Sequence, residues 1–119
     1  MKARIKRYHS PDVADLQKYR PDESDCFAFL LQLMIGPEES EGEESFDLLV
    51  CTPRYLGSQR PHQMPMFGRH LLIVNSYDFA EITKRLENYC NTLEEQDWHG
   101  LANKLSRIAH WEFEDYSER

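Results

Sequence analysis

The chain has 119 residues, of which 40% are hydrophobic. This size and composition predict one domain over residues 1–119 and exclude a wholly disordered chain. They also exclude a membrane-spanning helix, which would need an apolar run of about 18 to 20 residues. The formal net charge is −7, and residues 21–53 contain nine acidic side chains but no Lys or Arg. The negative electrostatic field of these carboxylates repels the phosphates of nucleic acids and favours a basic partner. We therefore expect no direct nucleic-acid binding.

The cellular compartment is predicted from the first residues and the cysteines. The N-terminal residues alternate in charge and lack the apolar stretch of a signal peptide. The cysteines, Cys26, Cys51 and Cys90, are odd in number and form neither a CxxC motif nor a disulfide framework. We therefore expect a cytoplasmic protein with reduced thiols and no membrane partner.

The first 25 residues predict a strand followed by a loop. Residues 2–8 alternate, which is typical of an edge strand that places Ala3, Ile5 and Arg7 on one face. Residues 10–25 are polar and contain two prolines, so they are expected to form a loop with at most one helical turn.

The acidic segment predicts a hairpin. Residues 27–35 are nearly all apolar and fit a central strand, while residues 46–52 alternate and fit a third strand that Pro53 closes. The Glu-rich connection between them has about ten residues, which favours an antiparallel pair joined by a long acidic loop.

After the hairpin, residues 54–67 contain two prolines and one glycine and have no clear period. They are expected to form a long surface loop, a kind of segment that is often functional. Gly68 is expected to permit a turn before a fourth strand at residues 70–74.

Two helices are predicted next. Asp78 with Glu81 resembles an acidic capping box, and Asp97 fits the N-cap of the second helix. The apolar faces are expected to comprise Phe79, Ile82, Leu86, Tyr89 and Leu93, and then Trp98, Leu101, Ala102, Leu105 and Ile108. Residues 111–116 alternate and form either a final strand or an extended tail. The predicted fold class is α+β, with a four- to five-stranded, mostly antiparallel sheet and two C-terminal helices packed on one face.

The sequence shows little support for catalysis. Cys51 is the best candidate nucleophile, but an apolar strand favours a buried, inert thiol. The histidines do not have zinc-ligand spacing with a cysteine, and the glycines form no phosphate-binding motif. The glutamates of the hairpin lack the spacing of a calcium loop. We therefore expect no catalytic residue, no metal and no cofactor.

Several motifs occur together in a characteristic order. They are Ile35-Gly36 and Phe46-Asp47, the segment Val50–Leu56, the segment Gly68–Val74 with Tyr77-Asp78, and Leu105–Arg107 before Trp111–Tyr116. In this order the chain resembles the immunity protein 8 family of bacterial polymorphic toxin systems, over roughly residues 27–116. The resemblance implies an α+β fold and a non-catalytic cytoplasmic protein that binds and neutralises a cognate toxin domain. It supplies no established contact residues.

The partner-binding residues are therefore predicted from charge and hydrophobicity. Acidic side chains suit a toxin with a basic cleft, such as a nuclease, and aromatic side chains supply apolar anchors. The expected contact residues are Glu38, Glu39, Glu41, Glu43, Glu44, Tyr55, Phe67, Glu112, Glu114 and Asp115. The sequence is equally compatible with a structural ion pair between Arg69 and Glu112 or Glu114. Two alternatives stay open. One is a structural or assembly subunit that forms a homodimer through residues 2–8 or through the exposed hairpin. The other is a small hydrolase that uses Cys51 or a His–carboxylate pair.

Overall fold

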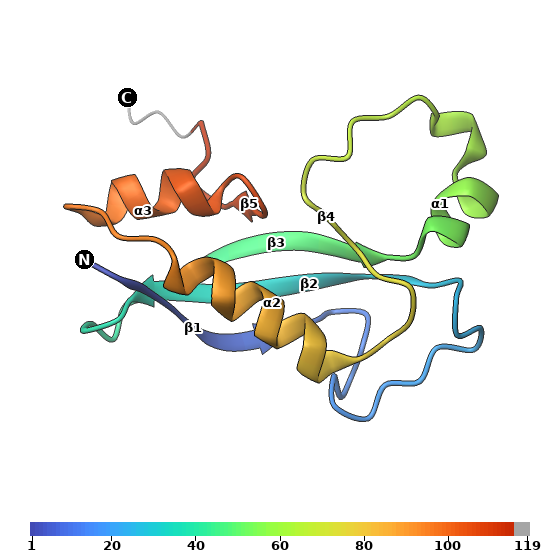
Figure 1. Cartoon of the computed structure of the whole chain (residues 1–119), viewed down its shortest axis with the longest axis horizontal. Coiled ribbons are helices and arrows are strands. Elements are labelled where there is room, and N and C mark those ends of the chain that lie inside the picture. Colours follow the sequence, from blue (N-terminus) through green and yellow to red (C-terminus); the bar gives the residue numbers. More distant parts are fainter. Residues whose placement is uncertain (116–119) are drawn as a thin grey trace.

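The computed structural model describes residues 1–115 and shows an α+β fold around a five-stranded sheet (Figure 1). The strands are β1 (Ala3–His9), β2 (Ala28–Pro37), β3 (Glu44–Cys51), β4 (Leu71–Ile73) and β5 (His110–Trp111). Their order is β1-β2-β3-β4, and β5 pairs with β3 beside β4. All pairs are antiparallel except β3 with β4, which are parallel. The predicted fold class is therefore confirmed.

The central hairpin has the predicted topology. β2 pairs with β3 in continuous register from Ala28 with Cys51 to Ile35 with Glu44. Alternate residues of both strands face one side, where none is more than 2% exposed: Phe29, Leu31, Leu33, Ile35, Phe46, Leu48 and Val50. Residues 38–43 connect the strands, so the acidic segment forms the tip of the hairpin.

The edge strand β1 differs from the prediction in which side chains face inward. Ala3 and Ile5 are buried, but the pairing with β2 shifts by one residue between Ile5 and Arg7. This irregularity reverses the alternation beyond Ile5, as an extra residue in a strand always does. Tyr8 therefore packs against the core, whereas Arg7 is exposed.

The prediction of a long loop at residues 54–67 is wrong for its first half. Helix α1 (Pro53–Gln59) follows β3 directly, and a 3₁₀ turn, η1 (Pro61–Gln63), follows α1. The Thr52 hydroxyl accepts a hydrogen bond from the Tyr55 amide at 3.2 Å, and Pro53 occupies the first helical turn, where no amide donor is needed. The same two residues thus end a strand and begin a helix.

The two later helices begin where the sequence predicts. The Asp78 carboxylate accepts from the Glu81 amide at 3.2 Å before α2 (Phe79–Asn91), and the Asp97 carboxylate accepts from the Gly100 amide at 2.8 Å before α3 (Trp98–Leu105). Their buried residues are Ile82, Leu86, Cys90, Leu101, Ala102 and Leu105. These side chains share one hydrophobic cluster with the inward-facing residues of the hairpin, and α2 crosses the sheet in Figure 1.

The last predicted strand is shorter than expected. β5 contains only two residues, and the remaining described residues, 112–115, continue as turns. Tyr116 of the predicted tail lies outside the described residues. None of the helices within residues 1–115 has the length and hydrophobicity needed to cross a membrane.

Candidate partner-binding surfaces

The tip of the acidic hairpin carries three exposed carboxylates, those of Glu38, Glu39 and Glu41. None of the three forms an ion pair within the described part of the chain. The backbone below them is fixed to β1: the Lys6 ammonium donates to the carbonyls of Ser40 and of Gly42, the latter at 2.9 Å. The fold therefore holds three unpaired negative charges at a defined position.

The next two glutamates of the hairpin make contacts within the chain. Glu43 forms an ion pair with Arg7 of β1. The Glu44 carboxylate accepts hydrogen bonds from the indoles of Trp98 at 2.5 Å and Trp111 at 3.1 Å. Glu44 therefore joins the hairpin to α3 and β5, and Trp111 is buried as expected of a core anchor.

The acidic residues after β5 lie beside the start of β3. The Glu112 amide donates to the Ser45 carbonyl at 3.1 Å, and the Glu112 carboxylate accepts from the Ser45 amide at 2.8 Å. Glu114 pairs with Arg69, which is one of the two ion pairs that the sequence left open, while Asp115 is exposed. The structure thus brings the second predicted acidic group to the end of the sheet that carries the hairpin tip.

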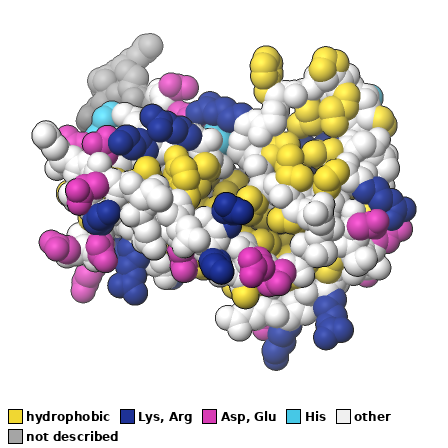
Figure 2. All heavy atoms as spheres, viewed as in Figure 1, with side chains coloured by type: hydrophobic (Ala, Val, Ile, Leu, Met, Phe, Trp, Pro, Cys, Tyr) yellow, Lys and Arg dark blue, Asp and Glu magenta, His cyan; other side chains and the backbone are white. Residues whose placement is uncertain are grey.

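The predicted aromatic contacts lie in the connection between β3 and β4. Tyr55 of α1 is half-buried, with the Arg60 guanidinium 5.6 Å from the centre of its ring. Phe67 is 96% exposed, and Met64 is 45% exposed in the same connection. Figure 2 shows hydrophobic side chains gathered over this part of the molecule. Since β3 has eight residues at about 3.3 Å each, roughly 25 Å separates Tyr55 from the hairpin tip. Phe67 lies two residues before Arg69, whose partner Glu114 follows β5 beside the start of β3.

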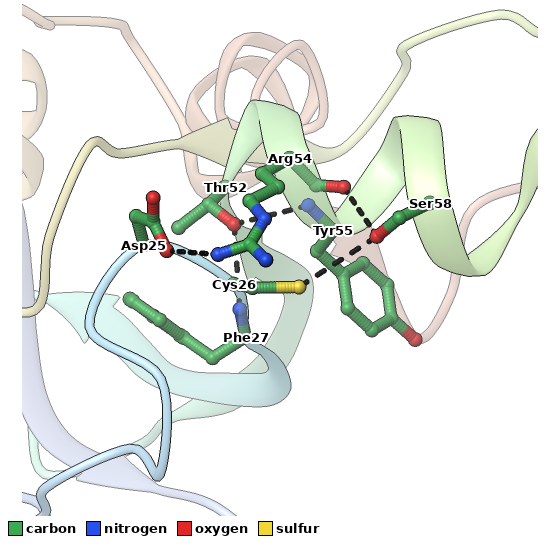
Figure 3. A network of polar contacts seen from close by, with 7 residues as sticks. All are labelled: Asp25, Cys26, Phe27, Thr52, Arg54, Tyr55 and Ser58. Carbon is green, nitrogen blue, oxygen red and sulfur yellow. Dashed lines mark hydrogen bonds and ion pairs between the residues drawn. The ribbon is translucent and has the colours of Figure 1, made fainter.

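The segment Val50–Leu56 has a structural function (Figure 3). Thr52 is fully buried, and its hydroxyl accepts from the Phe27 amide at 3.3 Å as well as from the Tyr55 amide. The Arg54 guanidinium pairs with the Asp25 carboxylate at 2.7 Å. These contacts join the start of α1 to the residues that precede β2.

The segment Gly68–Val74 is also tied to distant residues. A turn precedes β4 as predicted, and the Gly68 carbonyl accepts a hydrogen bond from the Leu71 amide at 3.3 Å across it. The left-handed residue of this turn is His70, with φ 66°, and no glycine has a positive φ. An imidazole nitrogen of His70 lies 2.8 Å from the Ser106 carbonyl, and the His70 carbonyl accepts from the Leu49 amide at 3.0 Å. The Gly-Arg-His motif therefore connects β3, β4 and the end of α3.

The hydrolase alternative loses Cys51 as its nucleophile. Cys51 has no exposed surface, and burial raises the pKa of its thiol. A nucleophilic cysteine requires access and a lowered pKa, which is the opposite environment. The other version of this alternative needs a His–carboxylate pair, and the His110 Nδ1 atom lies 3.4 Å from a carboxylate oxygen of Glu114. The described residues contain no group of three or more His, Cys, Asp or Glu side chains placed to hold a metal ion.

The homodimer alternative involves β1, which does lie at the edge of the sheet. Its exposed side chains include Arg4, Arg7 and His9. A second copy paired with this edge would bring like charges close together, which disfavours strand addition.

Sequence analysis did not identify a cavity of about 800 Å³ between the 10–25 loop and α2. Its walls include four aromatic side chains, Tyr8, Tyr19, Tyr77 and Phe79. They come from β1, from the loop and from the start of α2, so no local pattern connects them. The nearest signal in the sequence is the pair Tyr77 and Phe79 on either side of the Asp78 cap.

The sequence model of the family described as "Immunity protein 8" matches residues 3–116. This match includes β1 and the loop after it, which the motifs noted above do not cover. No curated protein and no solved structure matches the chain. Because the family match extends over nearly all of the 119 residues, the chain belongs to the immunity protein 8 family.

Proposed function

We propose that this protein is an immunity protein that binds a cognate toxin domain in the cytoplasm of the producing cell and neutralises it without catalysis. Family membership supports the class of function. The observation that supports the mode of binding is the hairpin tip, where Glu38, Glu39 and Glu41 project without cationic partners in the described chain. The proposed unit is a single domain over residues 1–119.

The acidic end suits a toxin whose active site is basic, as in a nuclease that binds phosphate groups. Three carboxylates on a fixed turn would occupy such a cleft, exclude the substrate and raise the association rate by electrostatic steering. Glu112 and Asp115 extend the negative surface next to the hairpin. Glu43 and Glu44 contribute to the field, but their carboxylates already have partners within the chain.

Apolar contacts are proposed to supply much of the affinity. Hot spots in protein interfaces are enriched in aromatic side chains that lose their water on binding, whereas exposed charges at the rim contribute less. Phe67 and Tyr55 can supply such contacts, and Tyr55 does so only for a toxin surface that extends along the length of β3 from the hairpin tip. A smaller interface would use one end of the sheet and leave the other exposed.

The experiment is a binding measurement with the toxin domain that is encoded next to this gene, at low and at high salt. We expect a Kd in the nanomolar range or below that rises with salt. The variant E38Q/E39Q/E41Q should bind more weakly and with a smaller salt dependence. No binding of the unaltered protein at either salt concentration would refute the proposed function.

A matched control distinguishes the effect of the position of the charges on binding from the effect of the net charge. The variant Q59K/N75K/N88K makes the same change in net charge at three exposed positions away from the hairpin tip. It should retain most of the affinity and of the salt dependence. Equal losses in the two triple variants would show that net charge alone controls binding, which would overturn the assignment of the hairpin tip.

A further inference from the structure

The aromatic cavity is open to the surface, and aromatic rings that contact one another form part of its lining. Tyr19 and Tyr77 meet edge to face with ring centres 4.9 Å apart, and Tyr8 and Phe79 do so at 5.5 Å. The rings of Tyr77 and Phe79 lie 6.5 Å apart and are nearly parallel. Four rings from three separate segments thus line one cavity of about 800 Å³, which is large enough to take the end of a long side chain.

The surroundings of this cavity are acidic. Asp78 and Glu87 line it, and the Tyr8 hydroxyl donates to the Glu87 carboxylate at 3.2 Å. Burial raises the pKa of Tyr8, and the charge of Glu87 raises it further. Burial also raises the pKa of Tyr77 to about 12, with further contributions from Tyr19 and the Asp15 carboxylate.

The third tyrosine, Tyr19, also has carboxylates near its hydroxyl. Burial raises the pKa of Tyr19, and the carboxylates of Asp22 and Asp12 add to the shift. Arg20 supplies the only positive charge among the residues that line the cavity. The lining therefore contains two carboxylates, Asp78 and Glu87, and one guanidinium, Arg20. The carboxylates of the 10–25 loop lie outside the lining but close enough to Tyr19 and Tyr77 to raise their pKa values.

We propose that this cavity receives a cationic side chain, a lysine or an arginine, of the toxin domain. Aromatic ring faces attract cations, and the attraction grows when water is removed and carboxylates lie nearby. Tyrosine is also enriched at the centres of protein interfaces, because its large ring has few rotatable bonds. This inference rests on the proposed function and adds a contact site apart from the hairpin tip.

A second cavity provides an internal contrast. It has a volume of about 300 Å³ and is lined by Arg69, Arg85 and Arg107 beside the ring of Tyr89. Its three arginines disfavour a cationic occupant. The protein therefore has aromatic rings in an acidic cavity and the ring of Tyr89 in a basic cavity. A cationic ligand should bind in the first cavity and not in the second.

The first test substitutes Tyr19, whose ring is half-buried. Tyr19→Phe keeps the ring face, whereas Tyr19→Leu keeps an apolar side chain without it. We expect the Phe variant to bind the toxin within about threefold of the unaltered protein and the Leu variant to bind about tenfold more weakly. Arg20→Gln should bind several-fold more tightly, because it removes the cation that competes for the site. Tyr89→Leu is the control for the loss of an aromatic ring outside the cavity, because Tyr89 lines the second cavity and is not among the proposed toxin contacts; it should leave the affinity nearly unchanged.

Thermal unfolding of each variant separates binding from folding. If Tyr19→Leu lowers Tm by more than a few degrees, Arg20→Gln becomes the deciding variant, since Arg20 is exposed. Equal affinities for the Phe and Leu variants at similar Tm would overturn the proposal. Unchanged or weaker binding by Arg20→Gln would also overturn it.

A second test does not depend on the toxin. The isolated protein is titrated with Nα-acetyl-arginine methylamide, or with the norleucine analogue, while NMR records the aromatic resonances. The arginine compound should shift the rings of Tyr8, Tyr19, Tyr77 and Phe79 but not that of Tyr89. Equal shifts with the norleucine analogue would identify an apolar site, and an absence of shifts would refute a cation site. If these shifts occur but the unaltered protein does not bind the toxin, the proposed function fails while the cation site stands.

Discussion

Glu44 accepts a hydrogen bond from the indole of Trp111, 67 positions later in the chain, at 3.1 Å. The contact joins the first residue of β3 to the last residue of β5. The hairpin glutamates therefore divide into two kinds. Glu38, Glu39 and Glu41 are exposed, whereas Glu44 satisfies indole donors of the core and Glu43 is paired with Arg7.

This division predicts different effects on stability. Glu44→Ala removes the acceptor of two indole N–H groups and should lower the free energy of unfolding by about 1–3 kcal/mol. Glu39→Ala, at an exposed position, should change it by less than about 0.5 kcal/mol. Urea unfolding followed by tryptophan fluorescence measures both values. Equal effects of the two substitutions would contradict the structural role of Glu44.

Thr52 is predicted to be important for stability and not for partner recognition. Thr52→Val keeps the shape of the side chain but leaves the amides of Phe27 and Tyr55 without their acceptor, and should cost about 1–3 kcal/mol. Thr52→Ser retains the hydroxyl and should cost less. Chemical denaturation gives both values, and a Val variant as stable as the Ser variant would show that the hydroxyl is dispensable.

Two glycines should respond in opposite directions to alanine. A Cβ atom at Gly36 would lie 1.8 Å from the Gly42 carbonyl oxygen, so Gly36→Ala must displace the hairpin tip and destabilise the fold. Gly57 lies within α1 and has no neighbour within 4 Å of such an atom. Gly57→Ala should stabilise the protein by about 0.5–1 kcal/mol, because alanine is the better helix former. Paired Tm measurements test the difference in sign.

The three cysteines should differ in reactivity. Burial raises the pKa of the Cys90 thiol to about 12, and the charge of Glu87 adds to the shift, while burial also raises the pKa of Cys51. Since the thiolate is the reactive form, both should resist a disulfide reagent at pH 8 until the protein unfolds. Cys26 is half-buried and should react first. Rapid labelling of Cys51 in the folded protein would restore the hydrolase hypothesis.

The same raised pKa values predict loss of stability at alkaline pH. The folded protein holds the protons of Cys90 and Tyr77 more tightly than the unfolded chain does. Their contribution to stability is therefore complete below the ordinary thiol and phenol pKa values, which are about 8.5 and 10. It declines as pH rises toward 12. Urea unfolding between pH 8 and pH 11 should show this decline, and Tyr77→Phe should make it shallower.

Substitution of Phe67 should weaken binding without lowering stability. Because its side chain is 96% exposed, Phe67→Ser should leave Tm nearly unchanged. If Phe67 is an apolar anchor, the same substitution should weaken toxin binding by tenfold or more. Unchanged affinity at unchanged Tm would confine the interface to other parts of the surface.

The sequence by itself determined the elements whose signals are local. The caps at Asp78 and Asp97 depend on residues within one helical turn, and the alternation in β2 and β3 depends on neighbours two positions away. Both kinds of signal predicted the observed elements. The short helix α1 was not predicted, because Leu56 is its only buried residue and it therefore has no apolar period. It also contains Pro53 and Gly57, which are more typical of loops.

Only the tertiary structure decided which residues that are distant in the chain lie next to one another. The irregular pairing in β1 turned Tyr8 instead of Arg7 toward the core, and the pairing of β5 with β3 placed Glu112 beside Ser45. The aromatic cavity combines residues from positions 8, 19 and 77–79. Such contacts depend on how strands and helices pack across long separations in the chain, and neither periodicity nor capping carries that information.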